Sequence, residues 1–278
     1  MSDAAAAADS RSRVLVVGGT GRLGGSLVRA SLDAGHPTLA LVRPHHLAGA
    51  GSPALKPLVD AGATLLEGSL EHYPSLLQAV RQVDVVICAV PTKQALEQKA
   101  LIRAIKEAGC VKRFIPAEFG LDPTKVQIRH MDHGFYEKKI EIRRSIESEG
   151  IPHTYICCNF LMRYLLPSLV QPGLDAPPRD EIRIFGEGNT KGVFVEQNDV
   201  AKFTICTIED PRTLNNTVHL RPPGNVYSMN ELVDLWETKI NKYLKKIYIT
   251  EEQLLKEIHG KCTISLEDGS SFYIFSIC

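Results

Sequence analysis

The chain has 278 residues, enough for one large or two modest domains, and its 44% hydrophobic content can fill a full core. Lysine plus arginine and aspartate plus glutamate both total 32, so the balanced charge predicts neither a nucleic-acid partner nor an anionic membrane surface. No apolar run reaches the roughly 18 residues of a membrane span, so we expect no transmembrane helix.

The N-terminal stretch MSDAAAAADSRSR carries acidic residues and no apolar core, so it does not read as a signal peptide. We expect residues 1–12 to form a disordered tail. The 7 cysteines are an odd number without metal-ligand spacing, and Cys157 and Cys158 lie in an apolar run typical of buried thiols. These features predict a cytoplasmic protein without a metal site.

From residue 13 to 160, short apolar segments alternate with helical patterns. Fully apolar strands separated by helices are typical of a parallel sheet covered on both faces, which is a doubly wound α/β domain. The expected strands are 13–17, 38–42, 63–67, 83–90, 113–116 and 153–159, and the expected helices are 22–34, 93–108 and 134–149.

After residue 160 the pattern becomes irregular and rich in proline. Residues 181–203 read as a hairpin leading into a helix, SMNE (228–231) is a capping box, and 249–258 reads as a short helix. We therefore expect residues 161–278 to form a smaller C-terminal substrate lobe whose elements interleave with the first domain.

A glycine-rich turn follows the first expected strand and opens the first helix. Gly18, Gly21 and Gly24 would allow a tight turn, close approach of the main chain to a pyrophosphate, and close packing of helix on strand. Residues 13–160 are thus predicted to be a dinucleotide-binding Rossmann domain. The expected cofactor-binding residues of this turn are Gly18, Gly19, Thr20, Gly21, Arg22, Leu23 and Gly24.

The second expected strand ends in Arg43 rather than in an acidic residue. An acidic residue there would hold the ribose 2′-hydroxyl of NAD and repel a 2′-phosphate, whereas arginine binds a 2′-phosphate. Arg43 therefore predicts NADPH as the cofactor, and Lys56 could add charge to the same phosphate. The alternative is a surface arginine that contacts nothing.

The helix expected over 134–149 contains two adjacent lysines. At ~100° per residue, Lys139 falls within the apolar stripe of Phe135, Ile142 and Ile146, whereas Lys138 falls at its edge. An ammonium in a buried stripe is costly unless it has a function, although a lysine whose stem covers apolar surface is the alternative. The Tyr-x-x-x-Lys pair of short-chain dehydrogenases is absent.

Several segments resemble the plant NADPH-dependent reductases of phenylpropanoids and flavonoids, an isoflavone reductase-like, NmrA-like group. They are GGTGRLG, RFIPAEFG, the Lys139 helix, ICCN (156–159) and EDPRTLNNTVHLRP, within residues 13–258. The resemblance implies that Lys139 is the general acid/base and that Arg143 lies near the cofactor. It also places Leu121, Tyr136 and Asn159 at the substrate.

Within this group, ICCN and RFIP are most similar to leucoanthocyanidin reductase. We therefore expect reduction of leucocyanidin to catechin, with a quinone methide formed before hydride reaches the benzylic carbon. Three departures bear on this: Leu121 replaces a histidine of that branch, Ala117 replaces a serine, and the family pattern stops near residue 258. The alternatives are pinoresinol-lariciresinol, phenylcoumaran benzylic ether and isoflavone reductases, or a non-catalytic NADP-sensing regulator.

Overall fold

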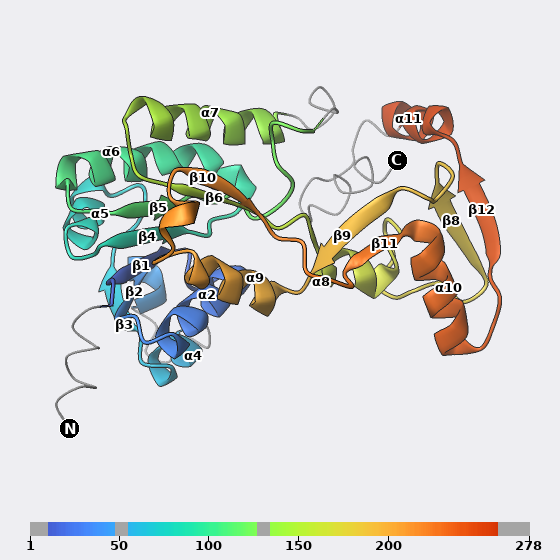
Figure 1. Ribbon diagram of the computed structural model, residues 1–278, viewed down its shortest axis with the longest axis horizontal. Helices are drawn as coiled ribbons and strands as arrows, with labels where there is room; N and C mark the ends of the chain where they lie inside the picture. The colour runs from blue at the N-terminus through green and yellow to red at the C-terminus, as the bar shows by residue number, and fades with distance from the viewer. Residues whose placement is uncertain (1–10, 48–54, 127–133, 261–278) are drawn as a thin grey trace.

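In a computed structural model, the protein consists of two lobes of unequal size (Figure 1), and the structure describes residues 11–47, 55–126 and 134–260. The larger lobe contains a five-stranded parallel sheet in the order β3-β2-β1-β4-β5. Its strands are β1 (Val14–Val17), β2 (Thr38–Val42), β3 (Thr64–Glu67), β4 (Val85–Cys88) and β5 (Arg113–Ile115). The doubly wound α/β fold expected from the sequence is confirmed.

The sheet continues beyond β5 through an isolated bridge between Phe114 and His153. Next come β6 (Thr154–Cys157) and, parallel to it, β10 (Asn216–His219). The carboxyl ends of β1, β4, β5 and β6 therefore lie along one edge of the sheet, which is where α/β folds of this kind bind ligands.

Helices cover both faces of this sheet (Figure 1). Successive residues of β1 alternate between two apolar clusters: Val14 and Val16 pack with α2, α4 and α9, while Leu15 and Val17 pack with α5, α6 and α7. Both faces of the strand are buried, which explains its unbroken apolar sequence. The bounds are α2 (Arg22–Asp33), α4 (Lys56–Asp60), α5 (Tyr73–Val80), α6 (Gln98–Ala108), α7 (Phe135–Ser148) and α9 (Gln197–Cys206), with short α3 (Pro44–Leu47) and η1 (Thr92–Glu97).

The smaller lobe contains two short sheets around its own apolar cluster, which includes Phe160, Ile184, Phe194 and Val233. Its helix α10 begins at the predicted capping box, in which Ser228 and Glu231 satisfy each other's main-chain N–H groups. The elements are β7 (Phe160–Leu161), α8 (Met162–Leu165), η2 (Leu166–Ser168), β8 (Glu181–Phe185), β9 (Lys191–Val195), β11 (Val226–Ser228), α10 (Met229–Ile240), β12 (Lys245–Ile249) and α11 (Glu251–Gly260).

The chain passes between the lobes more than once. After β9 it returns to the large lobe, where α9 packs on α2 and β10 extends the sheet, with η3 (Pro211–Thr213) between them. Gln197 Nε2 donates to the carbonyl oxygen of Arg22 at 3.1 Å, which ties α9 to the start of α2. Residues 197–219 are therefore part of the Rossmann lobe.

The predicted hairpin at residues 181–203 is wrong. Among the described strands, β8 pairs in parallel with β12, while β9 pairs with β11 and β7. The intervening turn bends away through Gly186 and Gly188, both at positive φ, and Asn230 of α10 binds Glu187 and Asn189. Each strand finds a partner from farther along the chain, so sequence adjacency misleads here.

Both chain ends carry predictions that fall largely outside the described residues. The expected tail includes residues 1–10, which are not described, but Ser12 is in place, with its carbonyl oxygen 3.0 Å from His36 Nδ1. The residues after 260 are likewise not described, so the departure expected beyond 258 lies mostly outside the structure. Within the described ranges, no helix combines the length and apolar character needed to cross a bilayer.

Candidate active site

The glycine-rich turn lies where the carboxyl ends of β1 and β4 meet. Gly18 has φ +88°, and a Cβ there would lie 2.8 Å from the carbonyl oxygen of Ala89, so only glycine fits. A Cβ on Gly24 would lie 2.0 Å from the carbonyl oxygen of Gly18, so this glycine lets α2 pack closely on the turn. Both requirements match the roles predicted for the first and third glycines.

The turn presents the start of α2 to the sheet edge. Gly21 is the N-cap, and the first turn of α2 contains no acidic residue. Free N–H groups and the positive end of the helix dipole favour a phosphate there. Of the other predicted residues, Thr20 is half-buried, Arg22 is exposed, Gly19 is buried, and Leu23 packs partly against the core.

Arg43 follows β2, the strand beside β1, and its side chain is exposed. Its Nη2 lies 3.4 Å from Nε2 of His46. Partial desolvation, with the charges of His45 and Arg43, lowers the pKa of His46, which favours a neutral ring beside the guanidinium. Lys56 is exposed at the start of α4, and the segment that connects it to α3 lies outside the described residues.

Lys139 is buried in α7, as the helical wheel predicts, with 5% of its surface exposed. Its Nζ donates a hydrogen bond to the carbonyl oxygen of Glu118 at 2.5 Å and lies 4.9 Å from the ring centre of Phe135. Burial lowers the pKa of Lys139; the charge of Arg143 also lowers it, while Glu118 opposes the shift. Lys138 is only half-buried.

The loop that follows β5 carries the acceptor of this hydrogen bond. Phe119 has φ +25°, an uncommon conformation for a residue with a side chain, and such strain persists only where neighbours fix it. Gln98 Oε1 accepts from the N–H of Ala117 at 2.8 Å, and the N–H of Asn159 donates to Gly120 O at 3.0 Å. Contacts from α6 and from the end of β6 thus hold the loop in place.

Arg143 lies one helical turn after Lys139 and pairs with two carboxylates. Its Nε donates to Glu118 Oε1 at 3.0 Å, Nη2 donates to Glu118 Oε2, and Nη1 donates to Asp122 Oδ1 at 3.1 Å. All three residues are buried. The cofactor contact expected for Arg143 therefore stays a prediction that this geometry does not favour, because the guanidinium is already engaged.

Glu118 and Asp122 are site residues that sequence reasoning missed. Both follow the apolar strand β5 in the segment AEFGLD, at the sheet edge where ligands bind. Their position directly after a buried parallel strand was the sequence feature that could have identified them as site residues.

The three residues expected at the substrate differ in exposure. Tyr136 is 2% exposed and packs edge-on against Phe135, with ring centres 4.9 Å apart, so a substrate would reach it only after its neighbours move. Asn159, at φ +56°, donates from Nδ2 to the carbonyl oxygen of Leu220 at 2.9 Å. Leu121 packs against the cluster of the smaller lobe, between the sheet edge and that lobe. Their contact with a substrate remains a prediction.

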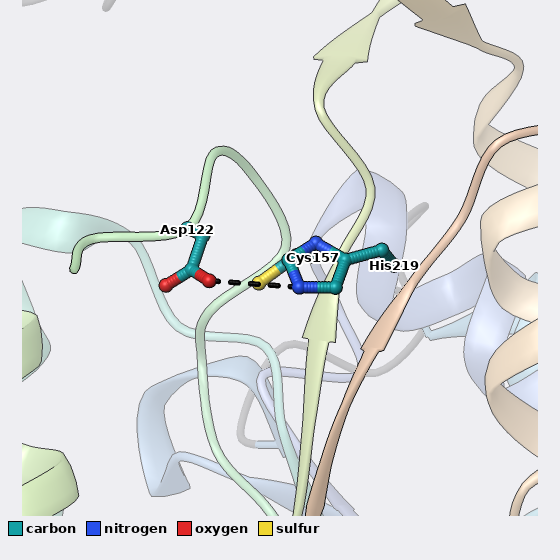
Figure 2. A group of neighbouring side chains, drawn as sticks. All are labelled: Asp122, Cys157 and His219. Carbon is teal, nitrogen blue, oxygen red and sulfur yellow. Dashed lines mark ion pairs between the residues drawn. The ribbon is translucent and has the colours of Figure 1, made fainter. Parts of the chain in front are cut away.

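Asp122 also meets Cys157 and His219, which come from β6 and β10 (Figure 2). One potential ligand atom from each lies within 4.8 Å of the others, a grouping that the sequence spacing does not reveal. Nε2 of His219 lies 3.6 Å from Asp122 Oδ2. Burial opposes ionisation of Asp122, but hydrogen bonds from Thr124 and the charge of Arg143 prevail and lower its pKa.

This cluster does not suit a divalent metal. Arg143 contacts both Asp122 and Cys157, with Nη2 3.6 Å from the sulfur, and Lys125 Nζ lies 3.9 Å from Asp122 Oδ2. A metal would sit against these cations. Burial also raises the pKa of the Cys157 thiol to about 12, so it stays protonated. We interpret the cluster as part of an ion-pair network.

A family model for NmrA-like proteins matches residues 10–274. The chain belongs to the NmrA-like family. The match also runs past residue 258, where the sequence resemblance was expected to stop.

One plant protein and one solved structure are similar to this chain over nearly its whole length. "Probable pinoresinol-lariciresinol reductase 3" of Arabidopsis thaliana is 61% identical over 267 residues, covering 96% of this chain and 85% of that protein. The solved structure "AtPrR2 with NADP+ and (+)pinoresinol" is 41% identical, with a TM-score of 0.87 over 95% of this chain and 86% of the other.

The comparison with leucoanthocyanidin reductase bears on the expected branch of the family. The Vitis vinifera enzyme in its binary complex with NADPH superimposes with a TM-score of 0.84, covering 95% of this chain and 86% of that chain, but is only 36% identical. The whole-chain comparison thus gives the pinoresinol-lariciresinol alternative more support than the leucoanthocyanidin branch to which ICCN and RFIP pointed.

Proposed function

We propose that this protein is an NADPH-dependent reductase that cleaves a benzylic C–O bond in a lignan such as pinoresinol. The observation that carries the proposal is the buried amino group of Lys139, held against the Glu118 carbonyl at the ligand-binding edge of the sheet. A 61% identical relative named for pinoresinol and lariciresinol supports the substrate class. A flavonoid substrate such as leucoanthocyanidin has less support.

The residues present fit NADPH. Gly18 and Gly24 leave room that a Cβ would fill, the first turn of α2 has no negative charge, and Arg43 is exposed beside the turn. Gly18–Gly24 would hold the pyrophosphate, Arg43 would hold the 2′-phosphate, and Lys56 would add a second cation there. When bound, the cofactor supplies the hydride for the benzylic carbon.

The chain's own contribution to the reaction is proton transfer. Neutral Lys139 accepts the phenolic proton, the phenolate electrons move through the ring, and the benzylic C–O bond breaks to give a quinone methide and an alkoxide. Once hydride has reached the benzylic carbon, the ring is again a phenolate. The proton held by Lys139 goes to the alkoxide oxygen, and one further proton from water restores the phenol. The lowered pKa of Lys139 increases the neutral fraction that this step requires.

Leu121 also fits a lignan better than a leucoanthocyanidin. Loss of the 4-hydroxyl from a leucoanthocyanidin benefits from a nearby acid, and Leu121 offers an apolar side chain where that branch has histidine. In a cyclic benzylic ether the alkoxide formed by C–O cleavage stays in the same molecule. It can therefore be protonated by Lys139 after hydride transfer, without a separate acid.

The test is a substrate panel with the purified protein and NADPH. Initial rates are measured at equal concentrations of pinoresinol, a phenylcoumaran, an isoflavone and leucocyanidin, with products identified by mass spectrometry. We expect pinoresinol to be reduced fastest, with one NADPH consumed per product. Binding of NADP(H) without single-turnover oxidation of NADPH by any of the four would instead support the non-catalytic sensor.

A further inference from the structure

We propose that Arg143 is a positioning residue for Lys139 and not a cofactor ligand: by pairing with Glu118 and Asp122, it holds the loop after β5 in the shape that seats the Lys139 amino group. The inference rests on the proposed reductase function, because it concerns the base of that reaction.

The first support is that two side chains of α7 form hydrogen bonds with the same loop residue. Lys139 binds the main-chain carbonyl oxygen of Glu118 at 2.5 Å, and Arg143, four residues later, binds its carboxylate through Nε at 3.0 Å and also through Nη2. Residues four apart on a helix point in the same direction, so the loop is clamped from one helix face.

The second support is that the guanidinium has little left to offer a cofactor. Besides Glu118, it binds Asp122 at 3.1 Å, lies 3.6 Å from the sulfur of Cys157, and stacks 4.4 Å above the ring centre of Tyr155. A bidentate buried pair of this kind is broken only at high cost.

The third support is the backbone beside the clamped residue. Phe119 has φ +25°, which the loop keeps only while its neighbours are fixed. Without Arg143, the Glu118 carboxylate loses its cation and this turn loses its main side-chain anchor, so the carbonyl that receives the Lys139 hydrogen bond is free to turn away.

The arrangement also determines the charge seen by Lys139. The groups that face it are Glu118 from the β5 loop, Cys157 at the end of β6, Cys158 directly after it, Arg143 from its own helix, and the ring of Phe135. Burial raises the pKa values of both thiols to about 12, so they are neutral near pH 7. Glu118 is therefore the anion that would hold a proton on Lys139, and Arg143 offsets it.

The experiment follows the titration of Lys139 in the full-length protein by NMR of ¹³Cε-labelled lysine, with the resonance assigned from Lys139→Met. The variants are Arg143→Met, Arg143→Lys, Glu118→Gln, and the double variant Arg143→Met/Glu118→Gln. Arg144→Met is the matched control, because Arg144 is the exposed neighbour on the same helix. The dissociation constant of NADPH is measured for each by fluorescence.

We expect the Lys139 midpoint to move to higher pH in Arg143→Met, to lower pH in Glu118→Gln, and to fall between them in the double variant. Arg143→Lys should lie nearer the parent than Arg143→Met, and Arg144→Met should match the parent. NADPH affinity should stay within about threefold throughout. Where a substrate is turned over, the acidic limb of the kcat–pH profile should shift in the same order.

An unmoved midpoint in Glu118→Gln, or an NADPH affinity lowered about tenfold or more in Arg143→Met with an unmoved midpoint, overturns the inference. If Arg143→Met does not fold, Glu118→Gln and the double variant decide, because neither leaves a carboxylate without its cation at position 118. The titration needs no substrate, so it gives a result even if the substrate panel shows no reduction and the proposed function fails.

Discussion

The amino group of Lys139 contacts the main chain of Glu118 and not its carboxylate, which is taken up by Arg143. A lysine paired directly with a carboxylate is held in its charged form, whereas a lysine bound to a carbonyl oxygen in a buried site loses its proton more easily. This contact is the relationship on which the proposed proton transfer depends.

Replacing Lys139 tests the base itself. Lys139→Met should lower kcat for pinoresinol by about 10²-fold or more while NADPH affinity stays largely intact, because the proton acceptor is lost and the glycine-rich turn is untouched. Lys138→Met is the control, since Lys138 is the half-buried neighbour outside the apolar stripe, and it should stay within about threefold of the parent. Equal losses in the two variants would contradict the role given to Lys139.

The same substitution has a consequence for stability. Burial lowers the pKa of Lys139 in the folded state, so between that pKa and the ordinary lysine value near 10.4 the unfolded chain binds more protons. The free energy of unfolding of the parent should therefore rise with pH over this interval, relative to Lys139→Met. At pH 7 the free energy of unfolding of Lys139→Met should equal that of the parent or exceed it by up to about 1 kcal/mol, because a buried ammonium is removed. Urea unfolding of both proteins at several pH values measures the difference.

Arg43 should select NADPH over NADH. Arg43→Ala removes a charged hydrogen bond to the 2′-phosphate and should weaken NADPH binding by about 1–3 kcal/mol while leaving NADH nearly unchanged. Arg29→Ala, at an exposed position of α2, is the control and should leave both affinities unchanged. Fluorescence titration of each variant with both cofactors gives the answer, and a parallel loss of both affinities would assign Arg43 a structural role.

Two adjacent glycines of α2 should respond differently to alanine. A Cβ on Gly24 would meet Gly18 O at 2.0 Å, whereas a Cβ on Gly25 would meet Gly19 O at an ordinary 3.5 Å. Gly24→Ala should push α2 away from the turn and lower NADPH affinity by about tenfold or more, while Gly25→Ala should bind normally. Calorimetric titration with NADPH compares them. Normal binding by Gly24→Ala would show that close packing of α2 on the turn is not required.

Leu121 should influence the choice between substrates. Leu121→His places a proton donor on the loop after β5 and should speed conversion of leucocyanidin to catechin by up to about 10²-fold, if departure of the 4-hydroxyl limits that rate. Leu121→Met keeps the side chain apolar and is the control. Initial rates on leucocyanidin and pinoresinol test this. If the leucocyanidin rate does not rise in Leu121→His, Leu121 is not the reason why leucocyanidin is expected to be the poorer substrate.

The large lobe was predictable because its strands are buried on both faces. A largely apolar run such as Thr38–Val42 is readily identified as a strand buried on both faces. Gly18 and Gly24 of the turn are required because a side chain there would clash with the main chain. The burial of Lys139 followed from helical periodicity alone, because α7 lies flat on the sheet.

The smaller lobe and the ion-pair network were harder to predict from the sequence. Strands β8 and β9 obtain their partners from β12 and β11, at sequence distances that local patterns do not encode. The pairing of Arg143 with Glu118 and Asp122 joins residues on α7 to a loop more than 20 positions earlier, and only the fold brings them together. The leucoanthocyanidin branch was favoured by two short matching segments, whereas similarity over the whole chain gives more support to the lignan-reductase alternative.

The return of residues 197–219 to the Rossmann lobe also limits how this protein can be recombined. A chimera that joins its first 160 residues to the remainder of another reductase would replace α9 and β10, and with them part of the cofactor lobe's core and its outermost strand. Transplanting the smaller lobe therefore requires exchanging two separate segments, 160–195 and 226–260, around a retained insert. Selection on such a gene would favour gradual substitution of single residues in the smaller lobe over the shuffling of an intact module.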